Sequence, residues 1–154
     1  MSTISAGQLF TYAEQQALAA VFRKTQSPAV GSVYLGLSTS AASGVLDNTA
    51  ATMAHASINE YATASGYARQ VYGPVTPTVA SPSLIYNTAI ITWGPFTSAP
   101  GTCVWGICCD AASGTSANVI AAFLLSSTRT PAIGDSLQAA AGTGSAGVGF
   151  ICQV

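Results

Sequence analysis

The chain has 154 residues, of which 49% are hydrophobic but only 6% are charged, and its formal net charge is −1. Average soluble domains carry about 25% charged residues, so a surface this neutral predicts extensive contact with copies of itself or with partners. Four basic side chains are too few for nucleic-acid binding, and no apolar run approaches the ~20 residues that span a bilayer.

We expect a single domain over residues 1–154, with a helix first and a β-rich part from about residue 32 to 154. The first residues, "MSTISAGQLF", lack the basic stretch and long apolar stretch of a secretory signal. Folding in a cytosol is therefore expected, where the four cysteines stay reduced.

Residues 11–24, "TYAEQQALAAVFRK", predict one amphipathic N-terminal helix. Thr11 and Glu14 have the spacing of a capping box, and Arg23 suits the C-terminal end of the helix dipole. Pro28 prevents continuation. The apolar residues recur at helical spacing and form a stripe: Ala17, Leu18, Val21 and Phe22.

Short segments rich in β-branched, aromatic or alternating residues follow, separated by turns rich in Gly, Pro, Ser and Asp. They predict strands within residues 32–40, 66–72, 83–94, 101–110, 118–127, 135–142 and 147–154. Residues 49–62 predict either a short helix or a long loop. This spacing predicts a mainly β fold, an antiparallel β-sandwich or jelly-roll-like domain with one N-terminal α-helix.

Three cysteines lie close together in sequence, at Cys103, Cys108 and Cys109. If residues 102–110 form a strand, Cys103 and Cys109 point to one face and Cys108 to the other. One metal ion cannot easily gather all three, so we expect buried thiols that behave as small hydrophobic groups. Whether Cys103 and Cys109 pair outside the cell is left open.

Little in the sequence indicates catalysis. His55 is the only histidine, and we expect a structural or exposed residue because a general base needs an orienting partner and a nucleophile in reach. Asp110 and Asp135 are typical of turn residues that bond their own backbone. We therefore expect no catalytic residue, no metal site and no cofactor, and keep a small hydrolase using Cys109 or Cys103 with His55 as a remote alternative.

The segment "SGYARQ", residues 65–70, holds one of the four cationic side chains, Arg69. Gly66 permits a bend before a strand, and Glu60 is the nearest acid in sequence. We hypothesise a Glu60–Arg69 ion pair that fixes the loop to the strand or holds a neighbouring subunit; the alternative is an exposed arginine that contributes little. The candidate structural or interface residues, including two from an end strand that could pair across subunits, are Glu60, Tyr67, Arg69, Gln70, Phe150 and Ile151.

Five motifs occur in a fixed order. They are "YLGLSTS" (34–40), Glu60 before "GYARQ" (66–70), "YNTAIITW" (86–93), "WGICCDAASG" (105–114) and "TRTPAIGDSLQAAAG" (128–142). Their order and spacing resemble a family of small tailed-phage virion proteins over nearly the whole chain. Two features depart from the family pattern: an extra residue in "WGICCD", which we expect to form a β-bulge, and the longer apolar end "GVGFICQV".

The resemblance implies a β-sandwich structural protein of the virion, made in the host cytoplasm, with no enzymatic activity. Members look like head-decoration or tail-fibre-like components. Our first expectation is a capsid cement protein on the outside of the capsid, bound in many copies to the major capsid protein and self-associating as a dimer or trimer. The alternative is a tail-fibre, baseplate or receptor-binding component.

Overall fold

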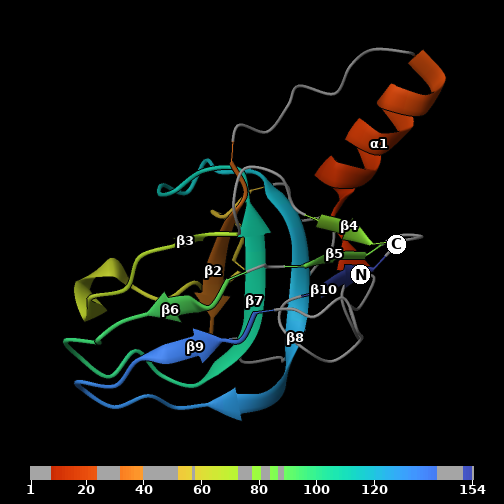
Figure 1. Ribbon diagram of the computed structural model, residues 1–154. Helices are drawn as coiled ribbons and strands as arrows, with labels where there is room; N and C mark the ends of the chain where they lie inside the picture. The colour runs from red at the N-terminus through yellow and green to blue at the C-terminus, as the bar shows by residue number, and fades with distance from the viewer. Residues whose placement is uncertain are drawn as a thin grey trace.

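The computed structural model describes residues 8–23, 32–39, 52–56, 58–72, 78–80, 84–86, 89–141 and 151–153. Within these residues the chain forms one α-helix, α1 (Thr11–Arg23), and one 3₁₀ turn, η1 (Thr63–Ser65) (Figure 1). The strands, in chain order, are β1 (Gln8–Leu9), β2 (Tyr34–Ser38), β3 (Gln70–Val71), β4 (Thr78–Ala80), β5 (Leu84–Tyr86), β6 (Ile91–Trp93), β7 (Cys103–Cys109), β8 (Val119–Arg129), β9 (Leu137–Ala139) and β10 (Ile151–Gln153).

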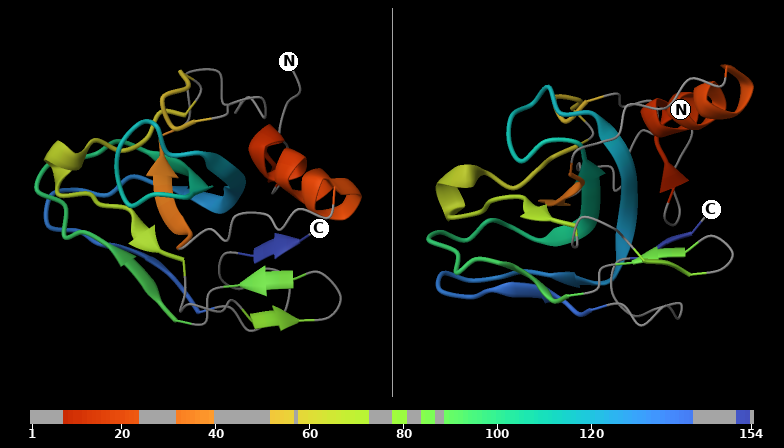
Figure 2. Two further views of the ribbon diagram at one scale, coloured as in Figure 1. Left: turned by 90° about the horizontal axis from the view of Figure 1, so that it is seen from above. Right: turned by 45° about the horizontal axis from the view of Figure 1, so that its top comes forward.

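The strands form three antiparallel sheets. The largest has five strands in the order β1-β8-β7-β2-β3, and the others are β10-β5-β4 and the pair β6-β9. In Figure 2 the β6-β9 pair lies alongside the large sheet, and β10-β5-β4 forms a separate small sheet. The predicted mainly β, sandwich-like fold with one N-terminal helix is confirmed.

The five-stranded sheet is buried on both faces. On one face it packs against the β6-β9 pair and the segment before β3, with a core that includes Leu35, Leu37, Tyr67, Trp93, Phe96, Cys108 and Phe123. On the other face it is covered by residues around Met53 and by Phe10, with Trp105, Ile107, Cys109 and Val119 from the sheet. Each core therefore contains one of the two tryptophans, so tryptophan fluorescence reports on the packing of both cores.

Strand β7 is irregular at both ends. Register shifts against β8 occur between Cys103 and Trp105 and between Cys108 and Cys109, and the second shift lies in "WGICCD", where we predicted a bulge. Cys103 and Cys108 pack in the first core, whereas Cys109 packs in the second. The prediction that Cys103 shares a face with Cys109 was wrong, because a shift of one residue reverses which face the following side chains occupy.

Two segments differ from the sequence-based expectation. Residues 83–94, predicted as one strand, contain β5 and β6, which belong to different sheets. The prediction missed this division because a β-branched run does not indicate where the chain passes from one sheet to another. In the ambiguous segment 49–62, the described residues form turns and extended chain, bridged to the body at Thr52↔Asn118 and Ser38↔Glu60. The short strands β1 and β4 were not predicted.

Helix α1 follows β1 and contacts β8, and in Figure 1 it projects away from the sheets. Its predicted range is confirmed to within one residue, while the capping box of Thr11 and Glu14 stays a prediction. Two large side chains of its apolar stripe are not buried: Leu18 is 56% exposed and Phe22 is 79% exposed. Among the described helices, none is long and apolar enough to cross a membrane.

Candidate functional site

The outer edge of β2 is covered by a single segment, residues 58–72, which pairs with it at two places. Strand β3 pairs with the start of β2, and Glu60 forms a bridge with Ser38 at its end. Between these pairings the chain leaves the sheet through η1 and turns at Gly66, whose φ of 77° is left-handed. The bend predicted at Gly66 is confirmed, and it leaves the middle of the β2 edge to be filled by side chains.

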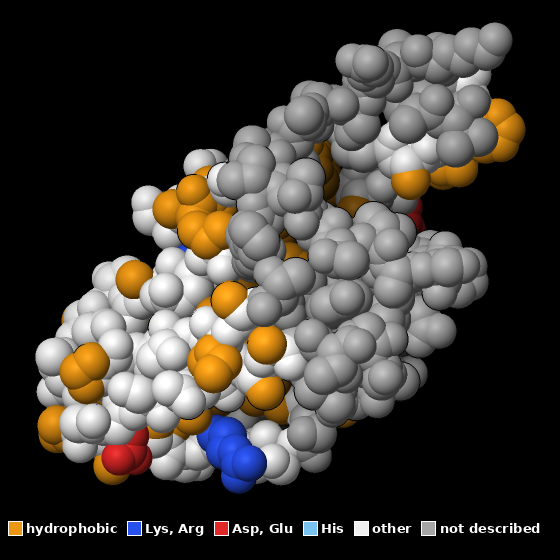
Figure 3. Space-filling model, viewed as in Figure 1, with side chains coloured by type: hydrophobic (Ala, Val, Ile, Leu, Met, Phe, Trp, Pro, Cys, Tyr) orange, Lys and Arg blue, Asp and Glu red, His pale blue; other side chains and the backbone are white. Residues whose placement is uncertain are grey.

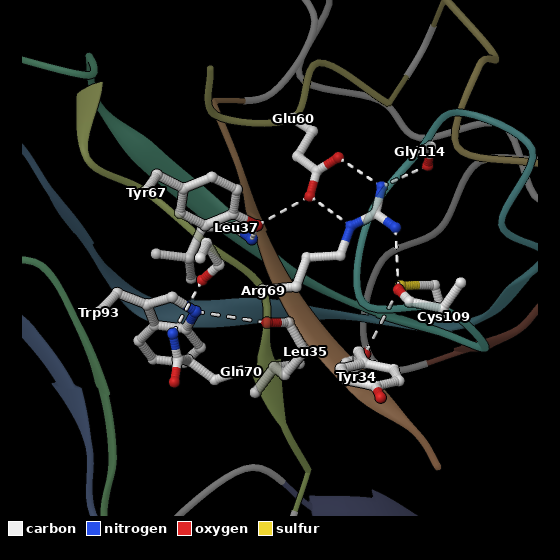
Figure 4. A network of polar contacts seen from close by, with 12 residues as sticks. Tyr34, Leu35, Leu37, Glu60, Tyr67, Arg69, Gln70, Trp93, Cys109 and Gly114 are labelled. Carbon is white, nitrogen blue, oxygen red and sulfur yellow. Dashed lines mark hydrogen bonds and ion pairs between the residues drawn. The ribbon is translucent and has the colours of Figure 1, made fainter. Parts of the chain in front are cut away.

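An ion pair between Glu60 and Arg69 lies in this gap (Figure 4). Arg69 Nε donates to Glu60 Oε1 and Arg69 Nη2 donates to Glu60 Oε2, both at 2.7 Å. Two parallel N–H···O bonds between guanidinium and carboxylate are the strong, geometrically specific form of this contact. The ion pair hypothesised from the sequence is therefore present, and it joins the start of the covering segment to its end.

Arg69 also reaches a distant loop. Its Nη1 donates to the carbonyl of Ala111 and its Nη2 to the carbonyl of Gly114, each at 2.9 Å. The same loop is closed by Asp110, whose Oδ1 accepts from the backbone N–H of Asn118 at 2.7 Å and whose Oδ2 accepts from the Asn118 side chain at 2.6 Å. The turn role predicted for Asp110 is confirmed in part, because the groups that it binds belong to Asn118 across the loop and not to its own neighbouring backbone. Arg69 holds the loop after β7 against the edge of β2.

Tyr67 completes the arrangement. Its hydroxyl accepts the backbone N–H of Leu37 at 2.9 Å and donates to Glu60 Oε1 at 2.8 Å. The Leu37 N–H belongs to the open edge of β2, so the tyrosine replaces a missing strand partner. We call Glu60, Tyr67 and Arg69, with the backbone groups of Leu37, Ala111 and Gly114 that they bind, the Arg69 network.

Gly36 gives the network its space. A Cβ at this position would lie 2.8 Å from Tyr67 Oη and 3.0 Å from Glu60 Oε1, and 3.7 Å from Arg69 Cγ. The side chains thus rest directly on the backbone of β2, and any larger residue would displace them. A glycine inside an alternating strand often marks such a close approach.

The network is largely removed from water. The Arg69 side chain is 4% exposed and the Glu60 side chain is 20% exposed. The hydrogen bond to Glu60 raises the pKa of Arg69 above its usual value, and burial, with the nearby Glu60 carboxylate second, raises the pKa of Tyr67. Both groups therefore keep one protonation state over the physiological range, which suits a fixed structural contact.

The neighbouring thiols are not activated. Cys109 Sγ donates to the carbonyl of Ala111 at 3.4 Å, and burial raises the pKa of the Cys109 thiol despite the nearby Arg69. Burial likewise raises the pKa of Cys103 to about 11. A thiolate is the nucleophilic form, so both environments oppose nucleophilic chemistry, and His55 is exposed on a separate loop.

The structure brings together three of the six candidate residues, Glu60, Tyr67 and Arg69. Gln70 lies beside them in β3, and its side-chain amide donates to the carbonyl of Ala68 at 3.0 Å. Ile151 begins β10 and pairs with Tyr86, while Phe150 lies outside the described residues. Their interface role stays a prediction.

Sequence reasoning missed the residues that complete the network. The carbonyls of Ala111 and Gly114 come from a loop more than 40 positions after Arg69, and their side chains give no indication of a bond to arginine. Gly36 carried a usable signal, since it is a glycine in the interior of the strand "YLGLS".

Residues 8–146 match the protein family described as Podophage GP4 fiber I protein gp80. The match covers most of the chain, including every residue of the Arg69 network. It supports the resemblance to phage virion structural proteins, while the particular motif pattern stays a prediction. No curated protein matches the chain.

Proposed function

Because this chain belongs to the Podophage GP4 fiber I protein family, it is a structural protein of a phage virion, and we propose that it is a component of a fibre. The observation that carries this proposal is the family match over residues 8–146. The sequence alone favoured capsid cement over a fibre role; the family description favours the fibre, which was the alternative.

We also propose that the protein has no catalytic activity. In the Arg69 network, the Arg69 donors are directed to Glu60 and to two loop carbonyls, so they are engaged in holding the fold. Cys103 and Cys109 are buried with raised thiol pKa values. These features support a scaffold whose polar groups serve its own rigidity.

Capsid cement remains the second candidate, supported by the low charge of the chain. A neutral surface suits packed contacts among identical copies and with the major capsid protein, where repeated like charges would repel. The fibre proposal instead requires partners elsewhere on the virion.

The test is a phage in which the gene for this chain is deleted and complemented in trans. We expect deletion particles to have intact heads, to lack fibres in negative-stain images and to adsorb poorly to host cells. Complementation with the wild-type chain is expected to restore the fibres. Deletion particles that keep their fibres but lose DNA-filled heads under osmotic or thermal stress would support cement and refute the fibre proposal.

A further inference from the structure

Residues 52–56 and 58–72 form a strap that wraps around the β2 edge of the five-stranded sheet. On one face of the sheet, Met53 and Ile58 from the strap are buried in the second core. On the other face, three tyrosines of the strap are buried in the first core: Tyr61, Tyr67 and Tyr72. One segment of the chain therefore supplies buried side chains to both cores.

The strap passes from one face to the other at Asn59 and Glu60, beside the end of β2. The carbonyl of Asn59 accepts the backbone N–H of Thr39 at 2.9 Å, and its side-chain amide donates to Thr39 Oγ1 at 2.6 Å. Ile58, just before this crossing, is 2% exposed, and Tyr61, just after it, is 3% exposed. The crossing is thus anchored at the sheet edge, between two side chains that lie in different cores.

The span over the second core begins on the loop after β7. The N–H of Met53 donates to the carbonyl of Ala117 at 2.9 Å, and Thr52 forms an antiparallel bridge with Asn118. Arg69 binds two carbonyls of the same loop. The start of the span is therefore attached to a loop that Arg69 fixes in place.

The span ends at Glu60, whose carboxylate Arg69 binds with two hydrogen bonds (Figure 4). Charge is scarce in this chain, with four basic and five acidic residues, and charged side chains show at few places on the face drawn in Figure 3. A buried ion pair costs desolvation, and apolar side chains of similar volume often stabilise a fold as well. We therefore expect this pair, with the Arg69 side chain 4% exposed, to serve the geometry of the chain around it.

We propose that Arg69 locks the strap, so that the second core does not open while the first core stays folded. Both cores share the five-stranded sheet, so lifting of the span from Met53 to Ile58 would by itself leave the first core intact. Such locally cooperative units open at free energies below that of global unfolding. Arg69 opposes this opening because it holds the loop at one end of the span and Glu60 at the other. The inference concerns the folded chain and holds whether the protein is in a fibre or a shell.

The test is native-state hydrogen exchange of the full chain at increasing urea concentrations below the unfolding transition. Two backbone amides are compared: Met53 in the span and Ile107 in β7, the strand that lies between β2 and β8. In the wild type we expect both amides to exchange through global unfolding, with the same steep dependence on urea. In Arg69→Met, the exchange rate of Met53 relative to that of Ile107 is expected to rise at least tenfold, and its urea dependence should become shallow, because the span then opens alone.

The matched control is Arg129→Met, at an exposed arginine in β8, which is expected to leave the ratio of the two rates at the wild-type value. Arg69→Lys is a second variant that keeps a cation beside Glu60. Lysine lacks the planar fork that binds the carboxylate and the carbonyls together, so the ratio is expected to rise here too. The proposal is overturned if Met53 already exchanges by local opening in the wild type, or if both Arg69 variants raise the rates of Met53 and Ile107 by the same factor.

Discussion

Replacing Arg69 with methionine tests whether the Arg69 network holds the fold together. Methionine keeps most of the apolar stem but removes the guanidinium and its four hydrogen bonds, two to Glu60 and one each to Ala111 and Gly114. The substitution leaves a carboxylate without its counter-charge and two loop carbonyls without their donor.

The expected cost follows from the burial of the two partners. Removing one member of a buried ion pair costs about 3–5 kcal/mol of unfolding free energy. The Glu60 side chain keeps 20% of its surface in water, so part of its charge stays solvated and the lower end applies. We expect Arg69→Met to lower the unfolding free energy by about 3 kcal/mol, a large part of the 5–15 kcal/mol typical of a domain.

The assay is urea unfolding followed by the fluorescence of Trp93 and Trp105, which report on the two cores. With an m value of about 2 kcal/mol/M, the midpoint is expected to fall by roughly 1.5 M. Measurements at two protein concentrations separate folding from self-association. Arg129→Met, at an exposed arginine in β8, is the matched control and is expected to stay within about 0.5 kcal/mol of the wild type.

A double-mutant cycle isolates the pair itself. Glu60→Gln in the Arg69→Met background removes the unpaired charge, so the double variant is expected to be less destabilised than the sum of the singles, with a coupling of about 2 kcal/mol. An Arg69→Met protein that loses less than about 0.5 kcal/mol, or strict additivity in the cycle, would refute the structural role of the network.

Three further outcomes are expected. Gly36→Ala should cost about 1–3 kcal/mol of unfolding free energy, because its methyl group would lie 2.8 Å from Tyr67 Oη. Adding Tyr67→Phe to this variant should lower the unfolding free energy by less than Tyr67→Phe does in the wild type, and full additivity in urea melts would contradict the predicted clash. Gly66→Ala should cost about 1–2 kcal/mol, because φ is 77°, and an unchanged melting midpoint would argue against that conformation. Burial raises the folded-state pKa of Cys103 from 9.0 to about 11, so the contribution of its protonated thiol to the unfolding free energy is complete below pH 9 and is lost as the pH rises to 11. Between pH 9 and 11 the unfolding free energy should fall less steeply with pH in Cys103→Ala than in the wild type, and an identical slope would show that this thiol is not responsible.

The sequence was sufficient for the fold class because its patterns are local. Capping and periodicity located α1, an alternating apolar pattern located β2, and apolar segments between Gly-, Pro-, Ser- and Asp-rich turns located β7 and β8. The choice of sheet for β5 and β6 depends on which distant strand each one meets, and a local pattern does not contain that information.

The candidate site divides in the same way. The scarcity of charge made Glu60 and Arg69 natural partners, and they do pair. The loop carbonyls of Ala111 and Gly114 could not be anticipated, because any residue supplies a carbonyl. The prediction of which face of the sheet Cys103 occupies was wrong for a related reason. The register shift between Cys103 and Trp105 depends on how β8 pairs with β7 and not on the composition of β7.

The most direct test of the fibre assignment is the copy number of this chain in purified virions, measured by quantitative mass spectrometry with the major capsid protein as the internal standard. A fibre component is expected at far fewer copies than the shell protein, and these copies should be lost together with the fibres when particles are sheared. A copy number in a simple ratio near that of the shell protein, retained on fibreless heads, would contradict the fibre assignment and establish capsid cement in its place.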